Sequence, residues 1–240
     1  MSGLVNFYDQ WPMIQIEEQK QLALALTIDQ FKEMDTMAIQ NYALPIELMM
    51  ENAGLQLARL VSSYANREDE IWIGIGPGNN GGGGLVAARR LSGWGYRVYL
   101  DMPEKKLKPL PAIQLGRALA AGAEISSFTK SDVFVDAYFG FSQKLPLPDT
   151  FLASIEKANL GSKLRISLDL PSGFNKDNGN LNFQPDLILT MAAPKIELIK
   201  FGYGPDLFIA DIGIPGDLYE YFGIRQPDFS QSGIVKYTKL

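Results

Sequence analysis

Four polar side chains stand where short apolar runs of this chain give way to turns. Asn79 and Asn80 lie in a glycine-rich loop, and Asp136 and Asp169 each follow a run of β-prone residues. Carboxylate and amide oxygens bind hard cations, and a carboxylate can also transfer a proton. The 240 residues include no His and no Cys, which excludes a Ser-His-Asp triad, a thiolate nucleophile and a zinc–thiolate site. Acid–base chemistry must therefore fall to Asp, Glu, Lys or Tyr.

Asp169 is the best candidate for the acid–base group. It precedes Leu170-Pro171-Ser172-Gly173, a turn sequence that would hold the carboxylate rigidly. Lys195 is the basic candidate, although a surface or packing lysine explains that residue equally well. An Asp at a strand end also commonly caps the next turn, so one such Asp by itself would not indicate a site. A functional site is indicated because several polar side chains follow predicted strands.

Asp136 belongs to a set of hard oxygen donors. Apolar residues flank it on both sides, which predicts partial burial, and a buried carboxylate needs a donor or a cation beside it. Asn79, Asn80 and Ser172 complete the set. Such ligands suit an alkali or alkaline-earth ion rather than a transition metal.

The glycine-rich loop predicts a ligand site of a second kind. An apolar strand precedes it and an apparent helix follows, so glycine N–H groups and the positive helix N-terminus could cradle a phosphate. The spacing Gly76-x-Gly78-x-x-Gly81 also matches the dinucleotide fingerprint, and Asp101 ends the next strand, where a ribose partner is expected. We therefore expect a nucleotide-like ligand. The alternative is a glycine-rich turn without a ligand.

Alternating strand and helix patterns place these candidates in an α/β fold. Thr27-Ile28-Asp29-Gln30 is a capping box that begins one helix, and a second follows Pro45. Because the carboxyl ends of parallel strands share one edge, the polar side chains would gather in one crevice. The expected strands are 71–75, 97–100, 133–136, 165–169, 187–191 and 207–212, and the later helices are 84–95, 109–122 and 150–159.

The chain reads as one domain, 27–240, after an N-terminal extension, 1–26, with a short helix expected at 17–26. Net charge is -5, from 22 basic and 27 acidic residues without a basic run, so nucleic acid is not expected as a partner. No apolar run approaches the roughly 20 residues of a membrane helix, and the first 21 residues lack the pattern of a secretory signal. We therefore expect a cytoplasmic protein that does not bind membranes.

Several motifs resemble the NAD(P)HX epimerases, the YjeF N-terminal domain proteins, which include the apolipoprotein-binding protein of animals. The similarity runs from about Thr27 to the C-terminus, with the motifs in the order and spacing of the family. The matching stretches are Met50-Glu51-Asn52-Ala53-Gly54, 76–82 with 84–89, 135–140 and 169–173, with further similarity at Lys195 and 211–215.

The resemblance implies a Rossmann-like three-layer sandwich with a mostly parallel central sheet, an N-terminal helical flank and a homodimer. It also implies epimerisation of NADHX and NADPHX, the hydrated forms of the reduced nicotinamide cofactors. Their R and S forms differ at carbon 6, which bears the hydroxyl. A separate dehydratase then acts on the S form.

The resemblance also implies roles for individual residues. Asn80, Asp136 and Ser172 would bind a potassium ion, and Asp169, the candidate catalytic group, would contact the substrate. The other expected substrate contacts are Asn79, Asn80, Gly81, Gly82, Gly83, Gly140, Phe141, Ser142, Gln143, Lys144, Leu145 and Pro146.

Gly83 departs from the family pattern, which reads Asn-Asn-Gly-Gly-Asp-Gly with an aspartate at this position. The missing carboxylate leaves open a catalytically weakened nucleotide-binding or scaffold protein of the same fold. A second alternative is an NAD(P)-dependent dehydrogenase, based on the fingerprint and Asp101. That alternative leaves Asp136 and Asp169 without roles.

Overall fold

One twisted sheet forms the centre of the protein. The computed structural model describes residues 13–16, 24–201 and 206–239. There, nine strands lie in the order β1-β9-β8-β7-β6-β5-β2-β3-β4. All neighbouring strands are parallel except β8 and β9. The strands are β1 (Met13–Ile16), β2 (Glu70–Ile75), β3 (Arg97–Asp101), β4 (Glu124–Ile125), β5 (Ser131–Ala137), β6 (Ser162–Leu168), β7 (Leu187–Met191), β8 (Asp206–Ala210) and β9 (Ile234–Lys239).

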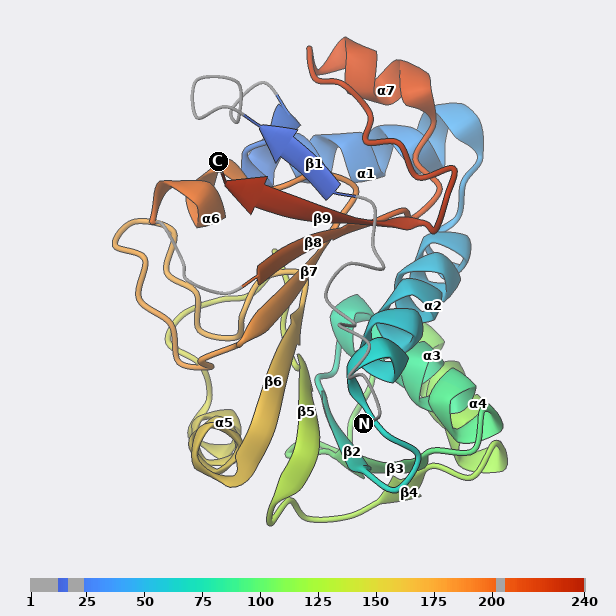
Figure 1. Cartoon of the computed structure of the whole chain (residues 1–240), viewed down its shortest axis with the longest axis vertical. Coiled ribbons are helices and arrows are strands. Elements are labelled where there is room, and N and C mark those ends of the chain that lie inside the picture. Colours follow the sequence, from blue (N-terminus) through green and yellow to red (C-terminus); the bar gives the residue numbers. More distant parts are fainter. Residues whose placement is uncertain (1–12, 17–23, 202–205, 240) are drawn as a thin grey trace, which may run out of the picture.

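Helices cover both faces of this sheet, which gives three layers (Figure 1). Helices α2, α3 and α4 lie on one face and α5 lies on the other. The expected α/β fold, with a mostly parallel sheet and a helical N-terminal flank, is confirmed. The helices are α1 (Ile28–Tyr42), α2 (Ile46–Tyr64), α3 (Asn79–Gly93), α4 (Pro109–Ala120), α5 (Asp149–Gly161), α6 (Ile196–Lys200) and α7 (Gly216–Tyr221).

The order of the strands reverses between β2 and β5. From β2 the chain adds β3 and β4 on one side, and it then returns to add β5, β6, β7 and β8 on the other. The helix after β2 and the helix after β5 therefore leave toward opposite faces (Figure 1). Such a switch point opens a crevice at the carboxyl ends of the two strands.

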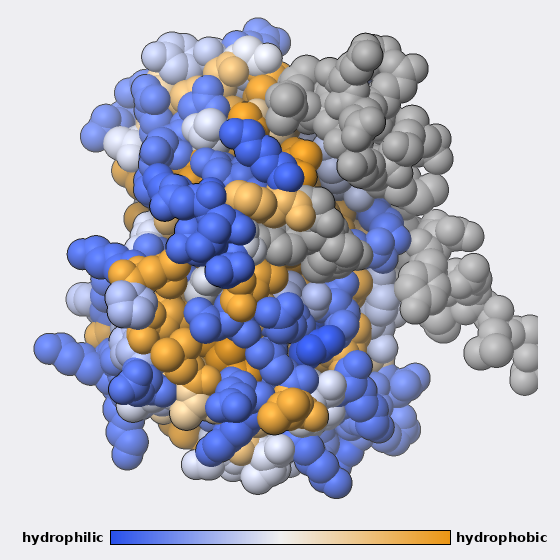
Figure 2. All heavy atoms as spheres, turned by 90° about the vertical axis from the view of Figure 1, so that its left-hand side faces the viewer, coloured by the Kyte–Doolittle hydropathy of each residue, from blue (hydrophilic) through white to orange (hydrophobic). Residues whose placement is uncertain are grey.

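The two faces of the sheet are packed differently. Aliphatic and small side chains fill the face under α2, α3 and α4. Aromatic rings fill the opposite face, where the rings of Phe128 and Phe134 meet edge to face with centroids 5.0 Å apart. Figure 2 shows the side that carries α5 and α6, where hydrophobic side chains gather in the middle and hydrophilic ones border them. The six large rings of the aromatic face are Trp72, Phe128, Phe134, Tyr138, Phe151 and Phe183.

The capping box at Thr27 is confirmed. The Gln30 amide donates to Thr27 Oγ1 at 3.1 Å, and the Thr27 amide donates to Gln30 Oε1 at 2.9 Å. These two bonds satisfy N–H groups that the first helical turn leaves free. Helix α1 therefore begins where the sequence predicts.

The predicted start of the third helix at Gly84 was wrong, because α3 begins at Asn79. The run Gly81–Gly84 belongs to the helix, which packs too close to the sheet to admit side chains at Gly81 and Gly84. A Cβ at Gly81 would lie 2.0 Å from the Gly76 carbonyl oxygen, and one at Gly84 would lie 2.6 Å from Ala137 Cβ. The glycines therefore allow close packing, and only the residues before Asn79 form a loop.

Five elements were not predicted, namely the short mid-chain strand β4 and, nearer the ends of the chain, β1, β9, α6 and α7. Strand β1 lies within the expected N-terminal extension and pairs with β9. Most of the helix expected at 17–26 falls outside the described residues, and Leu26 forms a parallel bridge with Lys195 instead. Among the described helices, none is long and apolar enough to cross a membrane.

Candidate active site

A cavity of about 280 Å³ opens at the carboxyl ends of the strands beside the switch point. Asn79, Asn80 and Asp169 line it together, as the sequence predicts. Asp136 and Ser172 are fully buried and are not among its lining residues. Further walls come from α1, α2, the loop after β5 and the end of β7, and include Phe31, Asp35, Met49, Met50, Gly83, Lys108, Gly140, Phe141, Ser142, Gln143 and Met191.

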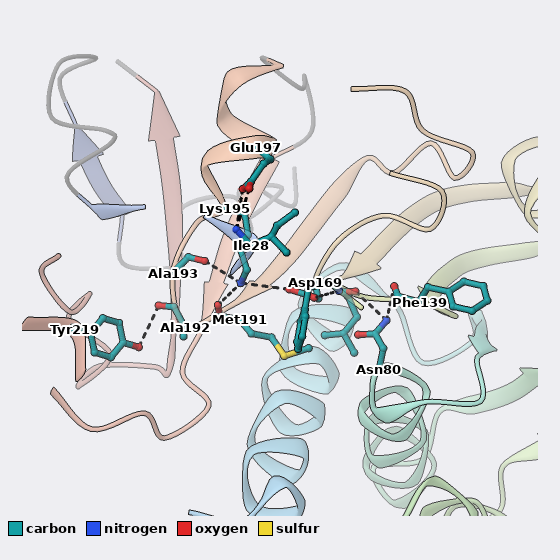
Figure 3. Close-up of polar contacts among 12 residues, drawn as sticks. Ile28, Asn80, Phe139, Asp169, Met191, Ala192, Ala193, Lys195, Glu197 and Tyr219 are labelled. Carbon is teal, nitrogen blue, oxygen red and sulfur yellow. Dashed lines mark hydrogen bonds and ion pairs between the residues drawn. The ribbon is translucent and has the colours of Figure 1, made fainter. Parts of the chain in front are cut away.

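Asp169 follows the last residue of β6 and is fully buried. Its φ of 68° is left-handed, a conformation that Asp tolerates better than most residues. Its Oδ2 accepts a hydrogen bond from the Phe141 amide at 2.8 Å, and its own amide donates to the Leu189 carbonyl at 2.8 Å. Its Oδ1 accepts no hydrogen bond from the described residues and lies 3.4 Å from Lys195 Nζ (Figure 3). The carboxylate is thus held in place, and its Oδ1 is left without a hydrogen bond within the described part of the chain.

Lys195 is a buried partner of Asp169, so the surface alternative is wrong. Its Nζ donates to the Met191 carbonyl at 2.7 Å and the Ala193 carbonyl at 3.2 Å (Figure 3), and lies 3.6 Å from the centre of the Phe31 ring. Burial lowers the pKa of Lys195, while neighbouring carboxylates, first among them Asp169, oppose that shift. The buried lysine is therefore part of the polar cluster around Asp169.

Asp136 is also fully buried, more than the partial burial predicted, and both of its oxygens are saturated. Oδ1 accepts from Ser172 Oγ at 2.6 Å and from the Tyr138 amide at 3.2 Å. Oδ2 accepts from the Ser172 amide at 2.8 Å and from Ser167 Oγ at 3.2 Å. Burial raises the pKa of Asp136 to about 6, although these four donors oppose the shift.

Asn80 connects the cavity to this buried cluster. Its Nδ2 donates to the carbonyls of Phe139 at 2.9 Å and Leu168 at 3.2 Å, while its Oδ1 is buried without a partner among the described residues. The Phe139 amide in turn donates to Ser172 Oγ at 3.2 Å. Asn80, Ser172 and Asp136 are thus joined through the backbone of one residue. The Asn80 Oδ1 is the unsatisfied oxygen of the set.

The N-terminus of α3 faces the cavity. Gly78 occupies the N-cap position without a side-chain cap, and the first turn carries no acidic residue. Pro77, Gly78 and Asn79 line the cavity beside it. A helix N-terminus with free N–H groups favours an anionic ligand group.

The expected substrate contacts divide into two groups. The residues Asn79, Asn80, Gly83, Gly140, Phe141, Ser142, Gln143 and Asp169 line the cavity. Gly81 and Gly82 pack inward, where a Cβ would contact Gly76 and Met50. Leu145 lines a second cavity of about 280 Å³ on the other side of the loop, and Lys144 and Pro146 line neither of the two.

Asp101 is not available as a ribose partner. It is buried, it accepts hydrogen bonds from the Tyr138 hydroxyl and the Phe128 amide, and it does not line the cavity. Its contacts lie among the aromatic rings on the α5 face of the sheet. The interpretation that supported a dehydrogenase was therefore wrong.

Asp35 was missed by the sequence analysis although it lines the cavity from α1. Burial raises the pKa of its carboxyl, and the nearby Asp169 charge raises it further, while Lys195 opposes the shift. The capping box fixes where α1 begins, but no local signal shows which of its faces meets the cavity.

These features define an α/β protein with a ligand cavity at the switch point of a Rossmann-like sheet. The chain matches the family described as "YjeF-related protein N-terminus" over residues 46–196. It is 33% identical over 216 residues to an NAD(P)H-hydrate epimerase of Rhodopirellula baltica, covering 83% of this chain and 88% of that protein. The chain therefore belongs to the YjeF-related N-terminal family.

Other relatives agree with this membership. An NAD(P)H-hydrate epimerase of Anopheles darlingi is 30% identical, over 86% of this chain and 95% of that protein. A bifunctional NAD(P)H-hydrate repair enzyme of Thermofilum pendens is 32% identical, and this chain spans 41% of it. The crystal structure of yeast ynu0 superposes with a TM-score of 0.81 at 22% identity, over 88% of this chain and 99% of the yeast chain. That likeness supports the fold.

Proposed function

We propose that this chain is an NAD(P)H-hydrate epimerase, an isomerase that interconverts the R and S forms of hydrated NADH and NADPH. The observation that carries the proposal is the Asp169 carboxylate, which is fixed at the cavity wall with its Oδ1 unfilled. Without His or Cys in the chain, a carboxylate is the natural group to move a proton at carbon 6. The names of the relatives support the same reaction.

In this proposal the cavity orients the dinucleotide around Asp169. The N-terminus of α3, from Asn79, binds phosphate oxygens through backbone N–H groups. The loop from Gly140 to Pro146 contacts the substrate along the opposite wall, where Gly140, Phe141, Ser142 and Gln143 line the cavity. Gln143 stiffens that loop, because it accepts from the Gly173 amide at 2.7 Å and donates to the Pro171 carbonyl at 3.2 Å.

Lys195 acts as a positioning residue in this proposal. Its Nζ lies 3.4 Å from Asp169 Oδ1, so the ion pair holds the carboxylate in one position. Two carbonyl oxygens and the Phe31 ring fix the ammonium group. The lysine does not line the cavity, so it acts through Asp169.

We propose potassium as the cofactor, held by Asn80, Asp136 and Ser172. The unpartnered Oδ1 of Asn80, together with a carboxylate and a hydroxyl, is a donor set that suits a large alkali ion. When bound, the ion would supply a positive charge at this edge of the sheet. The Ser172 hydroxyl donates to Asp136 here, so we expect it to rotate when the ion binds.

We also propose that residues 27–240 form the epimerase domain after an extension of residues 1–26. The protein would act in the cytoplasm as a homodimer, beside a separate NAD(P)HX dehydratase. The Thermofilum pendens relative supports a second enzyme in the same repair, because it is named as bifunctional and is more than twice as long as the part that this chain matches.

The test is an epimerisation assay on purified (R)-NADHX and (S)-NADHX with potassium chloride or choline chloride. We expect interconversion faster than the uncatalysed rate, with potassium increasing it. The same assay with NADPHX gives the cofactor preference. A rate equal to the uncatalysed one, with dinucleotide binding retained, would instead favour a weakened binding protein, as the missing side chain at Gly83 allows.

A further inference from the structure

A second carboxylate, Asp35, reaches the same cavity from a different element. Asp35 lies on α1, one helical turn after Phe31, and both residues line the cavity. The Phe31 ring lies 3.6 Å from Lys195 Nζ, and that ammonium group lies 3.4 Å from Asp169 Oδ1. Asp35 and Asp169 therefore approach one cavity beside a single buried cation.

The start of α1 is tied to the segment that carries Lys195. The Leu26 amide donates to the Pro194 carbonyl at 3.0 Å, and the Ile196 amide donates to the Leu26 carbonyl at 2.8 Å. The Glu197 carboxylate accepts from the Ile28 amide, with both oxygens at 3.1 Å (Figure 3). These bonds fix the helix against the lysine, so the position of Asp35 is built into the fold.

The Asp35 carboxylate has no structural task that would explain its burial. It is half-buried, and no hydrogen bond or ion pair joins its carboxylate to another described residue. By contrast, Asp29 on the same helix is exposed and pairs with Lys32 at 3.0 Å. An unpaired carboxyl group at a cavity wall is free to exchange a proton with a ligand there, and its partial burial raises its pKa.

We propose that Asp35 is a second proton-transfer residue of this site and works with Asp169 on opposite sides of the epimerisation. This inference rests on the proposed epimerase function. One route that inverts the hydroxyl-bearing carbon is loss of the hydroxyl followed by addition of water from the other face, and the inference concerns this route. The departing oxygen needs a proton and the incoming water must lose one, so an acid and a base acting together meet both needs.

The proposed step balances in atoms and charge. The carbon 6–oxygen bond breaks, the oxygen takes the Asp35 proton and leaves as water, and the ring nitrogen's lone pair forms a carbon–nitrogen double bond. Water then forms a new carbon–oxygen bond on the opposite face, and the electron pair returns to nitrogen. Asp169 accepts the surplus proton from that water. Solvent returns a proton to Asp35 and removes one from Asp169.

The charges around Asp35 favour this division of labour. Asp169 faces it as a like charge and Lys195 as an opposite one, while Lys108 lines the same cavity from the start of α4 and Glu197 lies beyond Lys195. Burial and Asp169 both raise the pKa of Asp35. Lys195 pairs directly with Asp169, whereas no ion pair joins a described residue to Asp35.

The experiment compares four proteins in the epimerisation assay, namely wild type, Asp35→Asn, Asp35→Ala and Glu33→Gln. Asp35→Asn should lower kcat by about 100-fold or more, with KM within a few-fold, because proton transfer rather than binding is lost. Formate should partly restore turnover to Asp35→Ala, since it replaces the missing carboxyl group. Glu33→Gln, an exposed change on the same helix, should match wild type.

The pH profile gives an independent readout. In wild type, kcat should fall as the pH rises through the pKa of Asp35, and the residual activity of Asp35→Asn should lack that fall. Turnover of Asp35→Asn within two-fold of wild type would overturn the inference, as would a loss confined to KM. A wild type that does not accelerate epimerisation would contradict the proposed function itself, so the two failures are distinguishable.

Discussion

Two buried aspartates follow neighbouring strands of this sheet, and their surroundings differ. Asp136, at the end of β5, accepts four hydrogen bonds from uncharged donors, so neither oxygen is left over. Asp169, after β6, accepts one amide hydrogen bond at Oδ2. Its Oδ1 faces Lys195 but accepts no hydrogen bond from the described residues. Burial is complete in both cases. The partners of the two carboxylates, rather than their burial, therefore distinguish the proposed acid–base group from the proposed ion ligand.

Replacing Asp169 by Asn tests the reactive side of this comparison and should have the largest effect. We expect catalysed epimerisation to fall by at least about 100-fold, because the amide cannot accept the proton. The assay on (R)-NADHX measures this loss. The change also leaves Lys195 buried without its counter-ion, so some loss of stability is expected as well.

The double variant Asp169→Asn/Lys195→Met separates the two effects. It removes both charges, so it should recover most of the melting temperature lost in Asp169→Asn without recovering activity. Recovery of turnover in the double variant would show that Asp169 only balances the lysine.

Replacing Asp136 by Ala tests the structural side. Its four donors would lose their acceptor, which should cost about 2–3 kcal/mol in the free energy of unfolding. Potassium should raise the melting temperature of wild type and of Asp169→Asn, but not of Asp136→Ala, because ligand binding to the folded state stabilises it. Thermal denaturation in potassium and in choline chloride measures both effects. An equal potassium response in all three proteins would refute the assigned ion site.

Adding a carboxylate at Gly83 sharpens the comparison by placing a third acid at the cavity. A Cβ at this position would meet only Leu168 Cδ2 at 3.1 Å, the end of a flexible side chain, so Gly83→Asp should fold. A charge-assisted hydrogen bond to the substrate is worth roughly 1.5–3 kcal/mol, so binding and turnover should rise about 10- to 100-fold. Titration calorimetry with dinucleotide gives the affinity.

Gly83→Ala is the matched control for that change. It adds the same Cβ without a charge, so its affinity should stay near that of wild type. If Gly83→Asp behaves like Gly83→Ala, the glycine is a neutral variation and the site works without a carboxylate there.

The smallest expected effect is the pH dependence of the difference in stability between wild type and Asp35→Asn. Because the folded pKa of Asp35 is raised, its contribution to stability is present below the unfolded pKa and lost as the pH rises through the folded pKa. Asp35→Asn should therefore be the more stable protein near pH 7 and lose that advantage toward pH 4. Urea denaturation at both pH values measures the difference. The opposite sign would show that Asp35 has a stabilising partner.

Local signals in the sequence predicted much of this fold. The capping box at Thr27 fixed the start of α1, and the apolar run at Leu187–Met191 gave both ends of β7. Strand β9 was missed, because its pairing with β8 and β1 joins distant parts of the chain. The start of α3 was missed because a run of glycines predicts a loop. The sequence alone does not show that this run is needed for close packing of a helix.

For the site, the sequence brought together the strand-end residues and named Asp169 as the acid–base candidate, but it could not show which donors surround each carboxylate. Asp136 and Asp169 both follow apolar runs, and the donors that saturate Asp136 come from another strand and its following turn. Asp101 matched a motif, yet its partner is Tyr138, across the sheet. Asp35 carried no signal, since its position depends on how α1 is attached to Lys195.

The four consecutive glycines in the first turns of α3, Gly81–Gly84, also have a consequence for the order of folding. Each glycine makes a helix about 1 kcal/mol less favourable than alanine does, so this turn cannot form early as an isolated helix. We expect it to form only when Gly81 and Gly84 can pack against Gly76 and Ala137, which the pairing of β2 with β5 brings together. We therefore expect the turn that is proposed to bind the substrate phosphates to be among the last parts of the protein to fold.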